Sequence, residues 1–153
     1  MQYVYSSPIG KLGIISDGDF ITGIRFEEDI EGETDGTCEA IDICVQQLDE
    51  YFAGRRRFFD LPLYMKGTDF QKTAWDALLQ IEYGGTATYG HIAAKIGKPK
   101  ACRAVGGANN KNPIPVIVPC HRVVGANGKM VGYAGGLWRK EWLLAHELED
   151  VYT

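Results

Sequence analysis

Residues 83–140 contain no aspartate or glutamate, in a chain of 153 residues whose formal net charge is −4. Nine of the 16 lysines and arginines lie in this segment, and all 20 acidic residues lie outside it. Whatever fold the segment adopts must carry a concentrated positive field, which favours a polyanion such as nucleic acid as the partner. The nine cations are Lys95, Lys98, Lys100, Arg103, Lys111, Arg122, Lys129, Arg139 and Lys140.

Composition and the N-terminus are typical of an ordinary globular protein. No apolar run approaches the roughly 18 residues that a membrane span needs, and the first residues lack the basic and apolar regions of a signal peptide. We therefore expect a cytoplasmic or nucleoid-associated protein that does not bind membranes. Its four cysteines form no CxxC pair and its three histidines are far apart, so the spacing predicts no metal site.

The first part of the chain is predicted to form a small α/β lobe over residues 1–66. Short apolar runs separated by Gly- and Asp-containing turns predict an antiparallel meander within residues 1–35, and the acidic tract 27–35 is expected to be an exposed loop. Helical spacing follows at 37–53, and residues 58–63 predict a last short strand.

The character of the sequence changes near Gly67, and residues 67–153 are predicted to form a second, mostly helical domain. A helix start at 68–70 is followed by apolar residues at helical spacing up to Ile81. Two short helices at 89–96 and 100–109, joined by a tight turn, indicate a helix–turn–helix over about residues 88–109. Further predictions are a hairpin through Asn127-Gly128 between 123–124 and 130–131, and a final helix over 137–148.

A Pro-Cys-His-Arg sequence at residues 119–122 directly follows the apolar run 116–118. Cys120 is a candidate nucleophile, but a free thiol with a pKa of about 8.5 is only slightly ionised at neutral pH and needs activation. Adjacency in sequence does not by itself place the His121 ring against the sulfur. The alternative is an inert buried cysteine beside a histidine whose hydrogen bonds are satisfied.

Residues 68–148 resemble the C-terminal domain of the O6-alkylguanine-DNA alkyltransferases, also known as methylated-DNA–protein-cysteine methyltransferases. The matching pieces occur in the family's order and spacing, and they are specific as a set. Residues 1–66 match only in kind, as the variable lobe that precedes the catalytic domain. The matching pieces are Arg103-Ala104-Val105-Gly106-Gly107-Ala108, Asn112-Pro113, Pro119-Cys120-His121-Arg122-Val123, Gly132-Tyr133-Ala134-Gly135-Gly136-Leu137 and Lys140-Glu141-Trp142-Leu143-Leu144-Ala145-His146-Glu147.

The resemblance implies a mixed α/β (α+β) fold, with a ribonuclease-H-like lobe built from a three-stranded antiparallel sheet and a helix, and a winged helix–turn–helix domain. It also implies a DNA repair activity that is direct, stoichiometric and irreversible. The alkyl group of O6-alkylguanine, and of O4-alkylthymine, in double-stranded DNA would pass to Cys120 of a monomeric methyltransferase. Because the protein itself is the acceptor, no cofactor is implied.

The resemblance also implies roles for residues around Cys120. His121 would act through a water while Glu147 accepts its other N–H, which gives a Cys–water–His–Glu relay. Asn112 would hold the Cys120 turn; the alternative is a plain Asn-Pro turn, and the two are compatible. Tyr89 would donate to guanine N3, and the alkyl pocket would be lined by Val123, Tyr133, Ala134 and Gly135.

The DNA contacts are expected on the helix–turn–helix. Arg103 resembles the family's arginine finger, which fills the gap left by a flipped base. The small residues Ala104 and Gly106 would let this helix approach the minor groove, although an ordinary major-groove helix–turn–helix is the alternative. Phosphate contacts are expected from Lys98, Lys100 and Arg122.

Two other functions remain open at this point. One is a binding protein without chemistry, either a helix–turn–helix regulator or an alkyltransferase-like lesion detector, although such detectors lack the active cysteine. The other is a cysteine hydrolase, which needs an acyl groove and an oxyanion hole that the sequence does not reveal.

Overall fold

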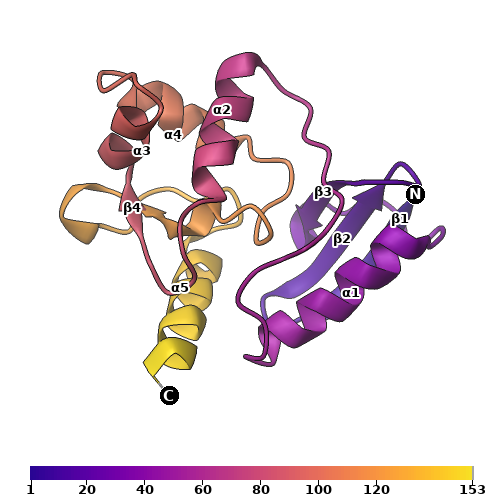
Figure 1. Ribbon diagram of the computed structural model, residues 1–153. Helices are drawn as coiled ribbons and strands as arrows, with labels where there is room; N and C mark the ends of the chain where they lie inside the picture. The colour runs from indigo at the N-terminus through magenta and orange to yellow at the C-terminus, as the bar shows by residue number, and fades with distance from the viewer. Residues whose placement is uncertain (153) are drawn as a thin grey trace. The chain divides into compact units, whose positions relative to one another are not determined.

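The computed structural model describes residues 1–152, with side chains up to residue 150. The chain packs into two compact units (Figure 1). The first unit contains residues 1–66 together with 113–117, and the second contains residues 67–112 and the chain from 118 onward. The two-domain division expected at 66/67 remains a prediction, and the segment 113–117 is an addition to the first unit that the sequence did not indicate.

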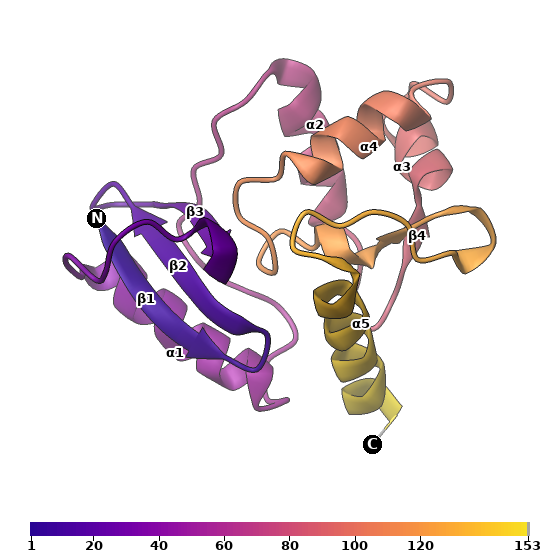
Figure 2. The same ribbon diagram turned by 180° about the vertical axis from the view of Figure 1, so that it is seen from behind.

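The first unit is a meander of three antiparallel strands, β1 (Gln2–Ser7), β2 (Gly10–Ser16) and β3 (Ile21–Phe26), in the order β1-β2-β3. Helix α1 (Glu39–Phe52) lies along one face of this sheet, as the two opposite views show (Figures 1 and 2). Its core contains fully buried Leu12, Ile14 and Ile41. This confirms the predicted α/β lobe.

Both outer strands of the sheet have partners within this unit. A short turn η1 (Glu27–Asp29) follows β3, and Thr34 then receives a hydrogen bond from the Val4 amide at 3.0 Å. On the other side, the Ile24 amide donates to the Pro113 carbonyl at 2.9 Å. The strand predicted at 58–63 is reduced to one bridge between Ile21 and Leu63, because Phe58 is 72% exposed and has no core to pack into.

The second unit is mostly helical. Trp75, in α2 (Asp69–Leu78), is 1% exposed and donates from Nε1 to the carbonyl of Ala108, in α4 (Cys102–Asn110), at 2.8 Å. This hydrogen bond joins the two helices. The elements are α2 (Asp69–Leu78), β4 (Ala87–Thr88), α3 (Tyr89–Lys95), α4 (Cys102–Asn110), η2 (Cys120–Arg122), β5 (Val123–Val124), η3 (Ala126–Gly128) and α5 (Leu137–Tyr152).

Helices α3 and α4 form the predicted helix–turn–helix. Thr88 and His91 make a capping box at the start of α3. It provides hydrogen-bond acceptors for backbone amides that have no partner within the first turn of a helix. Gly97, at φ 77°, makes the turn out of α3 because glycine adopts this left-handed conformation without strain.

The hairpin predicted through Asn127-Gly128 is wrong. Val123 and Val124 are buried and pair in parallel with Ala87 and Thr88 of β4. Met130 and Val131 are 38% and 41% exposed, so they have no apolar surface against which a second strand could pack. Across residues 1–152, no helix has the length and apolar character needed to cross a bilayer.

Candidate active site

Cys120 lies at the start of the short turn η2, and its side chain is buried, at 4% exposed. Its amide donates to the Val118 carbonyl at 2.8 Å, and the same carbonyl accepts Nδ2 of Asn112 at 2.8 Å. Asn112 also hydrogen-bonds the Cys120 side chain. The Asn112 amide therefore braces both the backbone of the turn and the sulfur.

His121, Glu147 and Arg122 form one buried ionic group. Nε2 of His121 lies 2.7 Å from Oε2 of Glu147, and Arg122 donates from Nε to Oε1 at 2.7 Å and from NH2 to Oε2 at 3.1 Å. The side chains of His121 and Glu147 are 0% and 1% exposed. Because a carboxylate can only accept, Nε2 of His121 carries the hydrogen and Nδ1 keeps its lone pair. Nδ1 is buried, and within the described residues it has no hydrogen-bond partner.

Burial sets the charge state of this group. It lowers the pKa of His121 against the pull of Glu147, so the ring is neutral at rest. Burial also acts to raise the pKa of Glu147, but His121 and Arg122 outweigh it and hold that pKa well below its usual range. Arg122 is charged whatever the state of the imidazole, so the carboxylate stays ionised and can stabilise an imidazolium when one forms.

The Cys120 thiol is protonated at rest. Burial raises its pKa, while hydrogen bonds from Asn112 and Tyr133 and the charge of Lys140 oppose that rise without cancelling it. The sulfur therefore becomes a nucleophile only when a base takes its proton, and the same neighbours then stabilise the thiolate.

Tyr133 is a closer partner of Cys120 than the sequence suggested. It was expected to line an alkyl pocket. Its hydroxyl is buried, and the nearby Cys120 sulfur adds to the rise that burial causes in the pKa of Tyr133. Of the other expected lining residues, Val123 is 0% exposed and Gly135 is buried, but Ala134 is exposed. An alkyl pocket lined by these residues remains a prediction.

Two cations that the charge count treated as part of the basic field instead hold the loop around Tyr133. Lys140 is 0% exposed and donates from Nζ to the carbonyls of Val131 and Gly132 at 3.0 and 3.3 Å. Arg139 is 2% exposed and donates from NH1 to the Gly135 carbonyl at 2.9 Å. The sequence carried no signal for this beyond their position at the start of α5.

The phosphate contact expected from Arg122 is wrong, because this side chain is buried. It is 7% exposed, and besides Glu147 it binds the Ile81 carbonyl from NH1 at 2.7 Å. A buried guanidinium that already donates to these acceptors cannot also bind a DNA phosphate. The exposed cations of the acid-free segment number six within the described residues, and they are Lys95, Lys98, Lys100, Arg103, Lys111 and Lys129.

The helix–turn–helix presents the other expected DNA contacts. Arg103 and Ala104 are exposed near the start of α4, and Gly106 is half-buried. Lys98 is exposed, with its ammonium 5.3 Å from the centre of the Phe70 ring. Tyr89 begins α3, and a Cβ placed on Gly106 would lie 3.9 Å from its ring. No role was expected for Asn109, yet it donates from Nδ2 to the Cys120 carbonyl at 3.3 Å.

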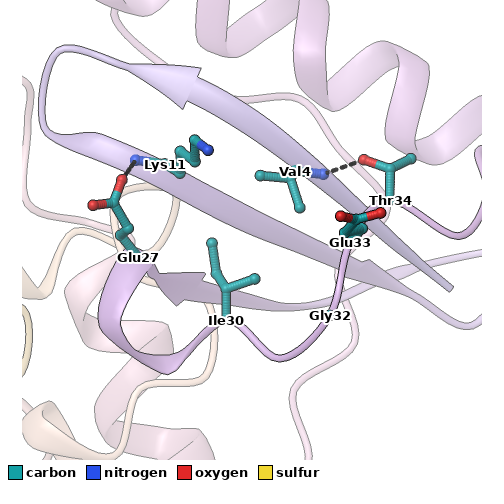
Figure 3. Close-up of a pocket in the computed structure, with 7 residues that line it drawn as sticks. All are labelled: Val4, Lys11, Glu27, Ile30, Gly32, Glu33 and Thr34. Atoms are coloured by element: carbon teal, nitrogen blue, oxygen red, sulfur yellow. Dashed lines mark hydrogen bonds between the residues drawn. The ribbon is translucent and has the colours of Figure 1, made fainter.

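A further pocket lies in the first unit, within the part of the chain that the structure describes. A pocket of about 500 Å³ lies between β1, β2 and the segment after β3, where Lys11 and two glutamates mix with apolar side chains (Figure 3). No cluster of residues suited to a metal ion occurs in residues 1–152. The pocket residues are Val4, Lys11, Glu27, Ile30, Gly32, Glu33 and Thr34.

Comparison with known proteins gives matches along nearly the whole chain. Residues 69–149 match the family model of the 6-O-methylguanine DNA methyltransferase DNA binding domain, and residues 2–65 match that of its ribonuclease-like domain. The chain is 47% identical over 154 residues to the methylated-DNA–protein-cysteine methyltransferase of Methanosarcina acetivorans, covering 94% of this chain and 96% of that one. The corresponding Mycobacterium bovis protein is 50% identical over 147 residues, covering 94% and 88%.

Solved structures of the same family are also similar to this chain. The crystal structure of Mycobacterium tuberculosis OGT in complex with DNA is similar with a TM-score of 0.90 and 46% identity. The match covers 97% of this chain and 93% of that one. The structure of the Mycobacterium tuberculosis O6-methylguanine methyltransferase matches with a TM-score of 0.89.

Proposed function

Because the chain belongs to the 6-O-methylguanine DNA methyltransferase family, we propose that Cys120 is the residue that accepts the alkyl group. The protein is a methylated-DNA–protein-cysteine methyltransferase, which repairs DNA by transferring an alkyl group to a cysteine. The substrate proposed here is O6-alkylguanine in double-stranded DNA, and O4-alkylthymine is a second substrate. Since the substrate is DNA, the location we propose is the cytoplasm or the nucleoid. We also propose that the protein acts as a monomer.

A comparison of the four cysteines is the observation that carries this proposal. Cys44 is buried, and burial alone raises its pKa to about 12. Cys38 is half-buried and contacts the Ser16 hydroxyl at 3.4 Å, and Cys102 is exposed. Among the four, Cys120 is the one whose sulfur lies near an amide, a phenol and a lysine and whose neighbour in sequence is a histidine paired with a carboxylate.

The reaction is a displacement at the alkyl carbon. The Cys120 sulfur forms the new S–C bond, the C–O6 bond breaks, and its electron pair moves into the purine, which takes a proton at N1 from solvent water and leaves as guanine. The thiol proton passes through one water to Nδ1 of His121, and Glu147 and Arg122 stabilise the imidazolium. Tyr89 donates to N3 while charge develops on the leaving base. The thioether cannot ionise, so each chain acts once.

The base must leave the duplex before this displacement. Flipping costs a few kcal/mol and is least costly for a poorly paired lesion. In our proposal, Arg103 fills the space that the flipped base vacates. Ala104 and Gly106 allow close contact with the DNA backbone, and Lys98, Lys100 and the other exposed cations bind the phosphates. A regulator that only binds DNA would not need the proton-handling groups around Cys120, so that alternative is disfavoured.

The relay is tested by substituting its members singly and together. Glu147→Gln and His121→Ala should each slow transfer from O6-methylguanine DNA by about 100-fold or more, the usual contribution of a general base. Each should raise the apparent pKa of the pH–rate profile, because the sulfur then loses its proton to a weaker base. The double variant should be no slower than the slower single variant.

Two controls keep the relay test interpretable. Glu141→Gln removes an exposed carboxylate of α5 and should leave the pH–rate profile unchanged. Thermal unfolding of each variant separates lost catalysis from lost structure, since Glu147→Gln also leaves Arg122 with a weaker partner. If the loss in log rate of the double variant equals the sum of the losses of the two single variants, the relay is contradicted.

Binding to duplex DNA should depend strongly on salt. If four or five of the six exposed cations neutralise phosphates, log Kd against log salt should have a slope of magnitude about 4. Lys98→Gln and Lys100→Gln should each reduce that magnitude by about one. Lys11→Gln, an exposed lysine of β2, is the charge-matched control and should not change it. A slope near zero for the unaltered protein would contradict the assigned role of these cations.

A further inference from the structure

Asn109 joins the helix–turn–helix to the nucleophile turn. It lies in the last turn of α4 and is 4% exposed. One of its amide hydrogens points to the Cys120 carbonyl, with Nδ2 and the oxygen 3.3 Å apart. Asparagine is an uncommon fully buried residue, so a buried side chain amide of this kind usually has a specific hydrogen-bonding role.

The Tyr89 side chain lies on the same face of α4 as Asn109. Gly106 precedes Asn109 by three positions, which places the two residues on one side of the helix. A Cβ on Gly106 would lie 3.9 Å from Cε1 and 4.0 Å from Cδ1 of Tyr89. Burial raises the pKa of Tyr89, and the neighbouring Asn109 side chain acts against that rise, as an amide near the Tyr89 oxygen would.

We propose that Asn109 is a positioning residue that links Tyr89 to the Cys120 turn and so directs the hydrogen of the Tyr89 hydroxyl toward the flipped base. The proposal rests on the proposed function, in which Tyr89 donates to the leaving guanine. It adds a residue that neither the sequence pattern nor the family resemblance indicated.

The hydrogen-bonding capacity of the two side chains supports this direction. An asparagine amide has two hydrogens, and Asn109 can give one to the Cys120 carbonyl and the other to the Tyr89 oxygen. A phenol oxygen that accepts a hydrogen bond keeps its own hydrogen free for the substrate. Without Asn109, the Cys120 carbonyl keeps the Val123 amide as a donor, but the Tyr89 oxygen loses the side-chain amide that directs its hydrogen. Oδ1 of Asn109 is buried and has no partner within the described residues, so nothing there holds the amide the other way round.

The test compares Asn109→Leu, which keeps the approximate shape but loses the amide, with Tyr89→Phe and with the double variant. Single-turnover transfer is measured on duplexes that carry O6-methylguanine or its 3-deaza analogue, in which C–H replaces the N3 acceptor. Asn109→Leu should slow transfer from O6-methylguanine by about 5- to 10-fold, the equivalent of one hydrogen bond. It should leave duplex Kd unchanged, should add nothing to Tyr89→Phe, and should have almost no effect on the 3-deaza substrate.

The controls distinguish a positioning role from a merely structural one. Asn110→Leu removes an exposed amide from the next position of α4 and should leave the transfer rate unchanged. If Asn109→Leu does not fold, Asn109→Ala removes the amide without adding a charge and should give the same pattern. Equal slowing on both substrates, or losses that add to those of Tyr89→Phe, would overturn the proposal. An unaltered protein that transfers no methyl group would overturn the proposed function itself, and the same assay shows this before any variant is made.

Discussion

Cys120→Ala is expected to transfer no methyl group while binding O6-methylguanine duplex almost as tightly as the unaltered protein. The sulfur is the acceptor, so nothing can replace it, whereas affinity comes from exposed cations such as Lys98, Lys100 and Arg103. Transfer and duplex affinity are measured separately, because a loss of both would indicate misfolding. Cys102→Ala, which removes the exposed cysteine of α4, is the matched control and should retain full transfer. Stoichiometric transfer that persists in Cys120→Ala would show that another residue accepts the alkyl group.

Arg103→Ala is expected to slow repair of duplex DNA by about 100-fold and to leave the reaction with free O6-benzylguanine almost unchanged. A flipped base costs a few kcal/mol, and each 1.4 kcal/mol that the side chain no longer supplies is a factor of about ten. The free base needs no flipping, so it reports the chemistry alone.

Arg103→Lys is the informative companion variant. It keeps the charge, so the salt dependence of binding should be retained, but a lysine cannot stack in the vacated space as a planar guanidinium does. Its repair of duplex should therefore resemble that of Arg103→Ala. Equal slowing of both substrates by Arg103→Ala would instead indicate damage to the fold and contradict the assigned role.

Local sequence patterns predicted most of the elements in this chain. Turn residues around Gly10 and Gly18 bracket three strands, and apolar spacing together with turn residues located helices α1 to α5 within a few positions. These signals succeed because they depend on periods of two and of 3.6 residues, which neighbouring residues alone determine. The hairpin failed for the opposite reason, since Val123 and Val124 pair with a segment far away in the sequence.

The charge of the basic segment was the least reliable guide to individual residues. A count treats every lysine and arginine as exposed, whereas Arg122, Arg139 and Lys140 are buried and bind a carboxylate or backbone carbonyls. The local sequence around them gave no sign of this, because their partners, a carboxylate of α5 and carbonyls of the loop before it, are brought to them only by the fold.

The candidate site shows the same division between local and distant information. The Pro-Cys-His-Arg sequence marked the nucleophile, and the family resemblance supplied Glu147, which lies 2.7 Å from His121. Neither indicated Asn109, whose role depends on how α4 packs against Tyr89 and Cys120. The assignments of Cys120 as acceptor, Tyr89 as donor and Arg103 as finger remain predictions.

The central claim is that Cys120 accepts the alkyl group, and mass spectrometry of the intact protein and of its peptides tests it most directly. After mixing with excess O6-methylguanine duplex, each chain should gain about 14 Da once, because S–CH₃ replaces S–H, and should gain no more on longer incubation. The added mass should map to the peptide that contains Cys120 and be absent from peptides that contain Cys38, Cys44 or Cys102. An unchanged mass, or added mass on any other peptide, would contradict the account.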